Sequence, residues 1–163
     1  MRRIMPVVLA VCLAWPALSL GTPAEGQKSP SFRAETLDGK VTEVGTAGNG
    51  NALLLVFWAT WCPHCLNDIP ELNAIHAKYA PKGLDLVGIN VGVNDSIPRV
   101  QSVIQKFKIA YPIVFDQGSK ITRLYEITGA PTFVLVDREG VVRLSLPGGP
   151  AAKVLSKLEQ IFK

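Results

Sequence analysis

Residues that bind metals or carry sulfur are scarce in this chain. Its 163 residues include three cysteines, two histidines and two methionines. Cys12 lies in an apolar N-terminal run, which leaves Cys62, Cys65, His64 and His76 as the possible soft ligands beyond it. A structural zinc site requires four ligands, and His64, between the two cysteines, cannot easily turn toward a metal that they would hold. We therefore expect no metal site.

Runs of like charge are also missing. The formal net charge is +4, and the basic residues are scattered along the chain rather than clustered. Without a basic run, nothing indicates that the protein binds nucleic acid. The sequence has no internal repeat or low-complexity segment, and its length suits a single domain.

The N-terminus differs in kind from the rest of the chain. Arg2 and Arg3 precede an uncharged run, IMPVVLAVCLAWPALSL, at residues 4–20. A basic start followed by an apolar run is typical of a secretory signal peptide, and the alternative is a retained membrane anchor, for which the run is short. We predict that residues 1–21 form this signal or anchor, residues 22–30 a linker and residues 31–163 one domain. Either form implies export.

Hydrophobic patterning beyond the linker alternates between strands and helices. Two short alternating segments flank Asp38-Gly39, a pair typical of a hairpin turn. Continuous apolar runs at residues 52–59 and 84–91 predict strands that are covered on both faces. The other predicted elements are helices at 63–79, 96–108 (with Ser96 as N-cap), 119–127 and 151–163, a short strand at 111–116 and a hairpin over 132–146. This alternation predicts an α/β fold in which helices flank a central sheet.

The distinctive chemistry of the chain is concentrated in the sequence WCPHC at residues 61–65. Covalent haem attachment requires a histidine directly after the second cysteine, where this chain has Leu66. A disulfide that closes so small a loop contributes little chain-entropy stabilisation. In an exported protein, an isolated thiol pair this close is more often chemical than structural, so a redox-active disulfide explains the motif best.

The position of the pair supports the redox interpretation. The motif follows a buried strand and precedes a helix, so Cys62 occupies the helix N-terminus, where free N–H groups and the macrodipole favour a thiolate. Cys65 follows one helical turn later, within reach of a disulfide. We expect Cys62 to be the exposed nucleophile and Cys65 the more buried resolving thiol.

Two motifs, FWATWCPHC (residues 57–65) and GAPTFVLVD (residues 129–137), resemble the thioredoxin superfamily. The N-terminal hairpin and the additional strand and helix before Gly129 are more similar to its exported TlpA/ResA/CcmG-like branch than to thioredoxin itself. The resemblance begins at about residue 31 and implies a thioredoxin-like fold with a central mixed sheet. It also implies a cis peptide bond between Ala130 and Pro131, facing the disulfide, and a backbone at Ala130 that pairs with the substrate chain.

This branch implies a thiol–disulfide oxidoreductase that works in the periplasm or another extracytoplasmic compartment and needs no cofactor. Cys62 and Cys65 would exchange a disulfide with protein thiol or disulfide substrates, as a reductant, for example in cytochrome c maturation. The resemblance further implies apocytochrome c as a client and a membrane redox donor of the DsbD/CcdA type as a partner.

The spacer within the motif favours the opposite direction of electron flow. Pro63-His64 is the spacer of DsbA-like oxidants, whose potential is about −120 mV against about −270 mV for thioredoxin. Pro63 would stiffen the turn, and His64 would stabilise the Cys62 thiolate. Stabilising the thiolate stabilises the reduced form and makes the disulfide a stronger oxidant. The ResA-like scaffold favours a reductant and the Pro63-His64 spacer favours an oxidant, so the sequence leaves both directions of electron flow open.

Residues near the WCPHC motif are predicted to assist proton transfer and substrate binding. Asp68 lies on the same helical face as Cys65, where ResA-like proteins carry an acidic residue, and would take or return the Cys65 proton. Thioredoxin has a buried aspartate in the preceding strand, at the position of Val56 here. Trp61 is predicted to form an apolar rim that receives a substrate peptide, and Trp58 to pack beneath the motif.

Two other functions on this type of scaffold fit less well. Copper-delivery proteins use a longer cysteine spacing and a distant histidine, whereas His76 is the last histidine of this chain and is predicted to lie at the surface. Peroxidases share the N-terminal hairpin but place their cysteine in a different context.

Overall fold

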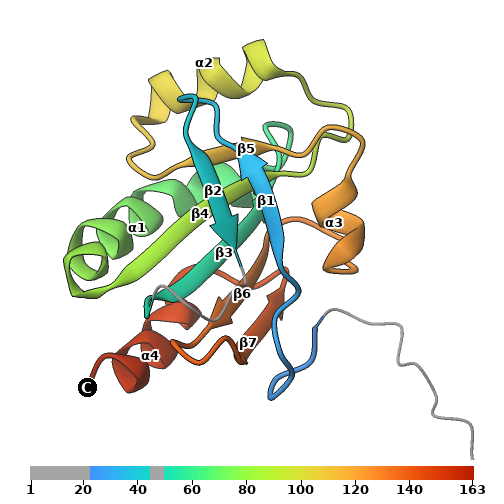
Figure 1. The fold of residues 1–163 in the computed structure, drawn as a ribbon. Coiled ribbons are helices and arrows are strands. Elements are labelled where there is room, and N and C mark those ends of the chain that lie inside the picture. Colours follow the sequence, from blue (N-terminus) through green and yellow to red (C-terminus); the bar gives the residue numbers. More distant parts are fainter. Residues whose placement is uncertain (1–22, 45–49) are drawn as a thin grey trace, which may run out of the picture.

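The computed structural model describes residues 23–44 and 50–163, so the predicted signal or anchor segment at residues 1–21 lies outside the described residues. Figure 1 shows a central sheet with helices around it and a two-stranded hairpin crossing in front of it. Within the described ranges, none of the helices combines the length and the apolar character needed to cross a membrane.

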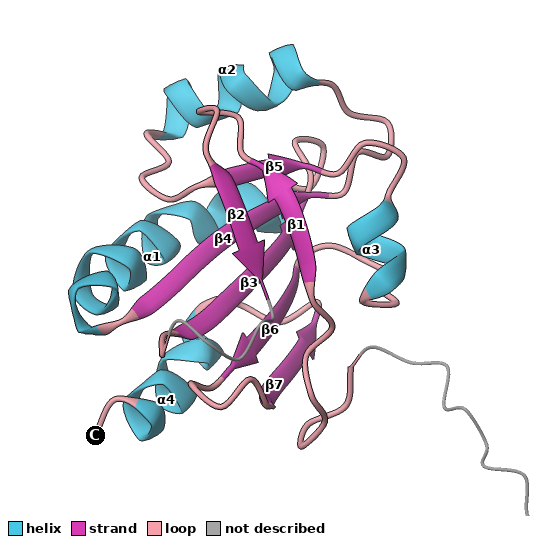
Figure 2. Cartoon of the chain, in the orientation of Figure 1, coloured by secondary structure: helices cyan, strands magenta, loops and turns pink. Residues whose placement is uncertain are grey.

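Most predicted elements are present close to their predicted bounds (Figure 2). The N-terminal hairpin consists of β1 (Phe32–Glu35) and β2 (Val41–Val44), which pair antiparallel. The elements that follow are β3 (Ala52–Trp58), α1 (Pro63–Tyr79), the 3-10 helix η1 (Ala80–Lys82), β4 (Leu84–Asn90), α2 (Ile97–Phe107), β5 (Ile113–Phe115), α3 (Lys120–Leu124), β6 (Thr132–Val136), β7 (Val142–Pro147) and α4 (Ala152–Ile161).

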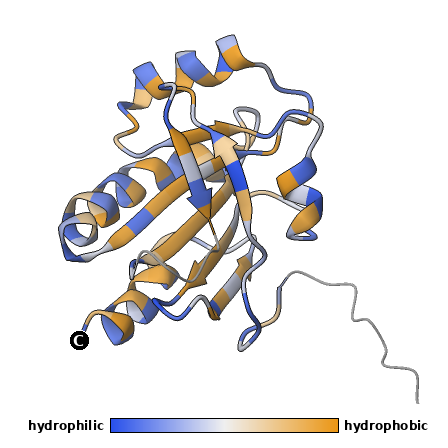
Figure 3. Cartoon of the chain, viewed as in Figure 1, coloured by the Kyte–Doolittle hydropathy of each residue, from blue (hydrophilic) through white to orange (hydrophobic). Residues whose placement is uncertain are grey.

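The central sheet is mixed, with strand order β5-β4-β3-β6-β7. β3, β4 and β5 run parallel, and β6 and β7 extend the sheet antiparallel on the other side of β3. Every residue of β3 is buried, as expected for an uninterrupted apolar strand covered on both faces. In Figure 3 the β3 and β4 ribbons are mainly orange, whereas the helices alternate between orange and blue. The central position of β3 places the WCPHC motif at the middle of one end of the sheet.

Two different layers cover the faces of the sheet. On one face α1 packs beside α4, with the rings of Tyr79 and Phe162 5.3 Å apart. On the other face, the ring of Tyr125, just after α3, lies 6.0 Å from Phe32 of the hairpin and 5.5 Å from Phe57 of β3. The N-terminal hairpin is therefore a structural layer of the domain.

The N-terminal part of the chain also contacts both outer strands of the sheet. Thr36, after β1, forms an antiparallel bridge with Val114 of β5. Lys28 forms another with Val141, the residue before β7. The described part of the segment 22–30, which we assigned to the linker, thus hydrogen-bonds to the backbone beside β7.

Candidate active site

The turn from β3 into α1 places both cysteines. β3 ends at Trp58, and α1 begins at Pro63, whose fixed φ and missing N–H suit the first helical position. Cys62 is the N-cap residue with an extended backbone, and Cys65 lies in the first turn. The two cysteines form a disulfide with their Cα atoms 5.3 Å apart, as their spacing predicts.

The start of α1 is an electrostatic environment that suits a thiolate. The backbone N–H of Cys65 donates to the Sγ of Cys62 over 3.2 Å. None of the described side chains in the first turn of α1 is acidic, so no carboxylate there opposes a negative sulfur. In the reduced protein, the free N–H groups and the helix macrodipole would both favour a negative charge on Cys62.

The predicted exposure of Cys62 is wrong for the disulfide form. Cys62 is 5% exposed and Cys65 is 3% exposed. The Sγ of Cys62 lies 3.5 Å from the carbonyl oxygen of Ala130, so the loop before β6 covers it on that side. The predicted role of Cys62 as the attacking sulfur therefore depends on its place at the helix N-terminus rather than on a larger accessible surface.

The loop before β6 faces the disulfide, as the resemblance implies. The peptide bond between Ala130 and Pro131 is cis. The Thr132 hydroxyl donates to the carbonyl of Gly129 over 2.8 Å and holds the turn of this loop. Since the carbonyl of Ala130 lies beside Cys62, a chain joined to Cys62 would run next to this backbone.

His64 and Asp68 lie four residues apart on α1. His64 is exposed, and Asp68 is half-buried, with its Oδ1 accepting a hydrogen bond of 3.3 Å from the N–H of Ala151 at the start of α4. Burial raises the pKa of Asp68, and the Ala151 hydrogen bond and the charge of His64 oppose this rise without cancelling it. A carboxyl group with a raised pKa, one turn from Cys65, is better suited to accept and return a proton than an ordinary surface aspartate.

The two tryptophans near the motif differ in burial in the predicted sense. Trp58 is 3% exposed, whereas Trp61 is 52% exposed. The indole Nε1 of Trp61 donates to the carbonyl of Val93 over 2.7 Å. An apolar groove of about 160 Å³ lies between Trp61, Val93 and the loop 127–130. Trp61 therefore stands at the edge of an apolar depression next to Cys62.

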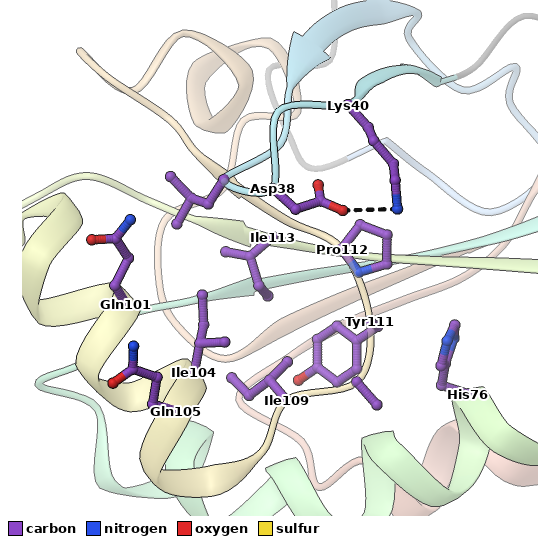
Figure 4. A pocket seen from close by; sticks show the side chains of 12 residues that line it. Asp38, Lys40, His76, Gln101, Ile104, Gln105, Ile109, Tyr111, Pro112 and Ile113 are labelled. Atoms are coloured by element: carbon purple, nitrogen blue, oxygen red, sulfur yellow. Dashed lines mark ion pairs between the residues drawn. The ribbon is translucent and has the colours of Figure 1, made fainter.

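His76, predicted to lie at the surface, is partly covered. It is half-buried, its ring packs edge-on to Tyr111 at 6.3 Å, and its Nδ1 has no hydrogen-bond partner among the described residues. It lines a hollow of about 610 Å³ between α2, the hairpin turn and residues 109–113 (Figure 4). The ion pair of Asp38 and Lys40 stands at the rim of this hollow. The hollow contains neither cysteine, so it is separate from the redox centre.

Asp95 is a residue of this region that sequence reasoning missed. Its carboxylate accepts four hydrogen bonds, from the N–H and hydroxyl of Thr60, the amide of Asn90 and the N–H of Ser96. Ser96 occupies the N-cap position of α2, as predicted, but its side chain makes no cap hydrogen bond. The sequence Asn94-Asp95-Ser96, between a buried strand and a helix, could have indicated this role of Asp95. An aspartate at the start of a helix accepts backbone N–H groups as well as a serine does.

Comparison with known proteins identifies the family. Residues 25–145 match the sequence profile of the AhpC/TSA family. The chain belongs to the AhpC/TSA family. The thiol–disulfide oxidoreductase ResA of Bacillus thuringiensis subsp. konkukian is 28% identical over 138 residues, which cover 85% of this chain and 76% of that protein.

Solved structures share the fold of this chain. A thiol:disulfide interchange protein of the thioredoxin family from Chlorobium tepidum TLS is 29% identical with a TM-score of 0.74, covering 86% of this chain and 99% of that one. StoA from Bacillus subtilis shares the fold, with a TM-score of 0.69 at 24% identity over 80% of this chain and 96% of that one. The thioredoxin-like fold predicted from the sequence is thus confirmed. With the Cys62–Cys65 pair at the start of α1, this AhpC/TSA member is a thiol–disulfide oxidoreductase of the ResA-like type.

Proposed function

We propose that this protein is an extracytoplasmic reductant that transfers two electrons from Cys62 and Cys65 to disulfides of partner proteins. The observation that carries the proposal is the cysteine pair at the N-terminus of α1, next to the cis Ala130–Pro131 bond. The similarity to ResA over most of the chain supports the direction of electron flow. The apolar groove beside Trp61 supports a polypeptide substrate.

The exchange takes two steps, in each of which one S–S bond replaces another. The Cys62 thiolate attacks one sulfur of the substrate disulfide, and the other substrate sulfur leaves as a thiolate and takes up a proton. The Cys65 thiol then loses its proton, with Asp68 as the proposed acceptor, and attacks the Cys62 sulfur. The second substrate sulfur leaves as a thiolate and takes up a proton. The substrate has gained two electrons and two protons, and the protein is left with its disulfide.

Repeated turnover requires a dithiol that reduces the Cys62–Cys65 disulfide again. The proposed donor is a membrane redox protein of the DsbD/CcdA type, and the proposed clients include the cysteines of apocytochrome c. Both follow from the resemblance to the ResA-like branch. Residues 1–21 would direct the protein to the periplasm or an equivalent compartment, as a cleaved signal or a retained anchor.

The Pro63-His64 spacer favours a DsbA-like oxidant as the second candidate. His64 lies in the first turn of α1, where a positive imidazole would stabilise the Cys62 thiolate and so the reduced protein. Equilibration of the purified protein with glutathione decides between the two directions. A potential near about −270 mV supports the reductant, and one near about −120 mV would reverse the assignment.

Trapping in cells tests whether the substrate is a protein. The full chain with Cys65→Ala should accumulate a mixed disulfide between Cys62 and its client, because the resolving sulfur is missing. The adduct is separated by non-reducing electrophoresis, released with reductant and identified by mass spectrometry. The double variant Cys62→Ala/Cys65→Ala is the matched control and should trap nothing. If the single variant also traps nothing, the protein does not act on protein disulfides.

A further inference from the structure

The loop between β4 and α2 is joined to the active-site turn by one carboxylate. The Oδ2 of Asp95 accepts from the backbone N–H of Thr60 at 2.8 Å and from the Asn90 amide at 2.9 Å. Its Oδ1 accepts from the Thr60 hydroxyl at 2.8 Å and from the N–H of Ser96 at 3.0 Å. Asp95 therefore connects the end of β4, the start of α2 and the residue two positions before Cys62.

All four partners of Asp95 act as donors, so the site requires an ionised acceptor. Burial alone would raise the pKa of Asp95, but the hydrogen bonds from Asn90, Thr60 and Ser96 outweigh it and lower the pKa. An asparagine at this position would place an NH₂ group where one of the two carboxylate oxygens now lies. That group would face either the N–H of Ser96 or the N–H donors of Thr60 and Asn90, none of which can accept through its N–H. At least one of these donors would then lose its partner.

The same loop carries one wall of the apolar groove beside Cys62. Val93 is 47% exposed, and its carbonyl accepts the Trp61 indole N–H at 2.7 Å. The opposite wall includes Ala130, whose carbonyl lies 3.5 Å from the Sγ of Cys62. A substrate segment next to a cysteine bound to Cys62 would therefore lie in this groove, with an apolar side chain against Trp61 and Val93.

We propose that Asp95 is a positioning residue for substrate recognition: it holds residues 91–96 against Thr60 and Trp61, so that the groove is formed before the substrate arrives. The inference rests on the proposed function, because it assumes a polypeptide substrate. A groove fixed in advance avoids the entropy cost of ordering two loops on binding. Asp95 touches neither cysteine in the described contacts, so its effect should fall on binding of extended substrates rather than on the reactivity of the sulfur.

The test compares a large and a small disulfide with the reduced full chain. The large probe is an oxidised peptide with a leucine before a Cys-Ala-Ala-Cys-His sequence, and the small probe is 2-hydroxyethyl disulfide, which cannot fill the groove. Asp95→Asn should raise the half-saturating concentration of the peptide about tenfold and leave its maximal rate and the rate with the small probe within about twofold.

Matched variants separate positioning from general loss of structure. Asp85→Asn changes a carboxylate at the opposite end of β4, where it accepts from Asn51, and should affect neither probe. Thr60→Val removes one of the four donors while keeping the side-chain shape, and should give a smaller change in the same sense. It serves as the test if Asp95→Asn does not fold.

A second readout does not depend on activity. In ¹⁵N NMR spectra, the Trp61 indole signal is assigned by its loss in Trp61→Phe, and its hydrogen exchange should accelerate about tenfold or more in Asp95→Asn. If the wild-type protein does not reduce the peptide, the proposed function fails, and the indole exchange alone decides the role of Asp95. Equal slowing with both probes would overturn the proposal, as would an unchanged half-saturating concentration for the peptide.

Discussion

At the scale of the residue, the two histidines of the chain occupy opposite ends of α1 and should differ in their effect on the sulfurs. His64 is exposed in the first turn, beside the disulfide, and His76 is half-buried against Tyr111. Twelve helical residues separate them by about 18 Å. That exceeds the Debye length of about 8 Å at physiological ionic strength, so only the charge of His64 should reach Cys62.

His64→Gln should therefore make the disulfide less oxidising. Without the imidazole, the Cys62 thiolate loses a source of stabilisation, and the reduced form becomes less stable relative to the disulfide. We expect the potential to fall by on the order of 30 mV, about a tenfold change in the equilibrium constant with glutathione. His76→Gln is the control and should leave the potential unchanged. Equal shifts in both variants would contradict the role given to His64.

Asp68→Asn should slow the second step of the exchange and spare the first. The raised pKa of Asp68 and its place one turn from Cys65 suit it to accept the proton of the resolving thiol. Stopped-flow measurements would follow formation and decay of the mixed disulfide. We expect decay to slow at least about tenfold, with formation within about twofold, because general-base assistance contributes about a hundredfold or more where it operates. If only formation of the mixed disulfide were slower, Asp68 would act on Cys62 rather than on Cys65.

The same substitution should not lower stability at neutral pH. The folded protein holds the Asp68 proton more tightly than the unfolded chain, so it binds more protons between the ordinary pKa of 3.8 and the raised value. The contribution of Asp68 to the free energy of unfolding is therefore greatest below this window and declines as pH rises through it. Asp68→Asn removes that decline, because asparagine does not titrate. Denaturant unfolding of the oxidised protein from pH 4 to pH 8 would reveal a steeper fall in the wild type than in the variant.

At the scale of the element, the turn after β4 leaves no room for a side chain at Gly92. Its φ is +69°, and an added Cβ would lie 2.4 Å from the carbonyl oxygen of Asp116. That oxygen belongs to the backbone and cannot rotate away. The N–H of Gly92 also donates to the Oδ1 of Asn90 at 3.0 Å, so the tight turn helps to place the loop that ends at Asp95.

Gly92→Ala should consequently cost more than backbone strain alone. Gly118 has a similar φ of +74° with nothing within 4 Å of the added Cβ, so Gly118→Ala measures the strain without the clash. We expect about 1 kcal/mol for Gly118→Ala and about 1–3 kcal/mol more for Gly92→Ala. Denaturant unfolding monitored by circular dichroism gives both values. Equal losses would show that the turn relaxes to accommodate the Cβ.

The elements that the sequence predicted best are those whose pattern is local. The apolar runs of β3 and β4 and the start of α1 at Pro63 could be read from neighbouring residues alone. The predictions that the structure corrects or refines depend on segments distant in the sequence. His76 is half-buried because residues 109–113 lie beside it, and Cys62 is covered because the Ala130 carbonyl faces it. The Asp95 network likewise joins residues 90–96 to Thr60, two segments that only the folded sheet brings together.

At the scale of the whole molecule, Tyr125 joins the N-terminal segment to the core. Its hydroxyl donates to the carbonyl of Pro30 over 2.6 Å and lies 2.9 Å from the Ser29 hydroxyl. Burial raises the pKa of Tyr125 to about 12, and the Ser29 hydrogen bond opposes this rise. The hydroxyl therefore remains protonated across the physiological range and can continue to donate.

Tyr125→Phe should loosen this segment without unfolding the domain. The ring contacts are retained, but the Pro30 carbonyl loses the Tyr125 hydroxyl and keeps only the longer hydrogen bond of 3.4 Å from the Ser29 hydroxyl. We expect this to cost about 1–3 kcal/mol in the free energy of unfolding. Hydrogen exchange should accelerate at the backbone N–H of Gly26, which donates to Val142, and remain slow in β3. Ser29→Ala, which leaves the shorter hydrogen bond from Tyr125 to the Pro30 carbonyl intact, should have a smaller effect. Equal acceleration in β3 would mean that the segment and the core open together.

The bridge between Lys28 and Val141 has a consequence for the order of assembly. Its partners are separated by nearly the whole domain, so this contact cannot form until the chain has been synthesised as far as the last hairpin. Contacts of such long sequence separation form slowly, because the chain must first close a large loop. The parallel strands and the disulfide centre can be complete earlier. Docking of the N-terminal segment would then be a late step, and would close the sheet edge beside β7 to pairing with another chain.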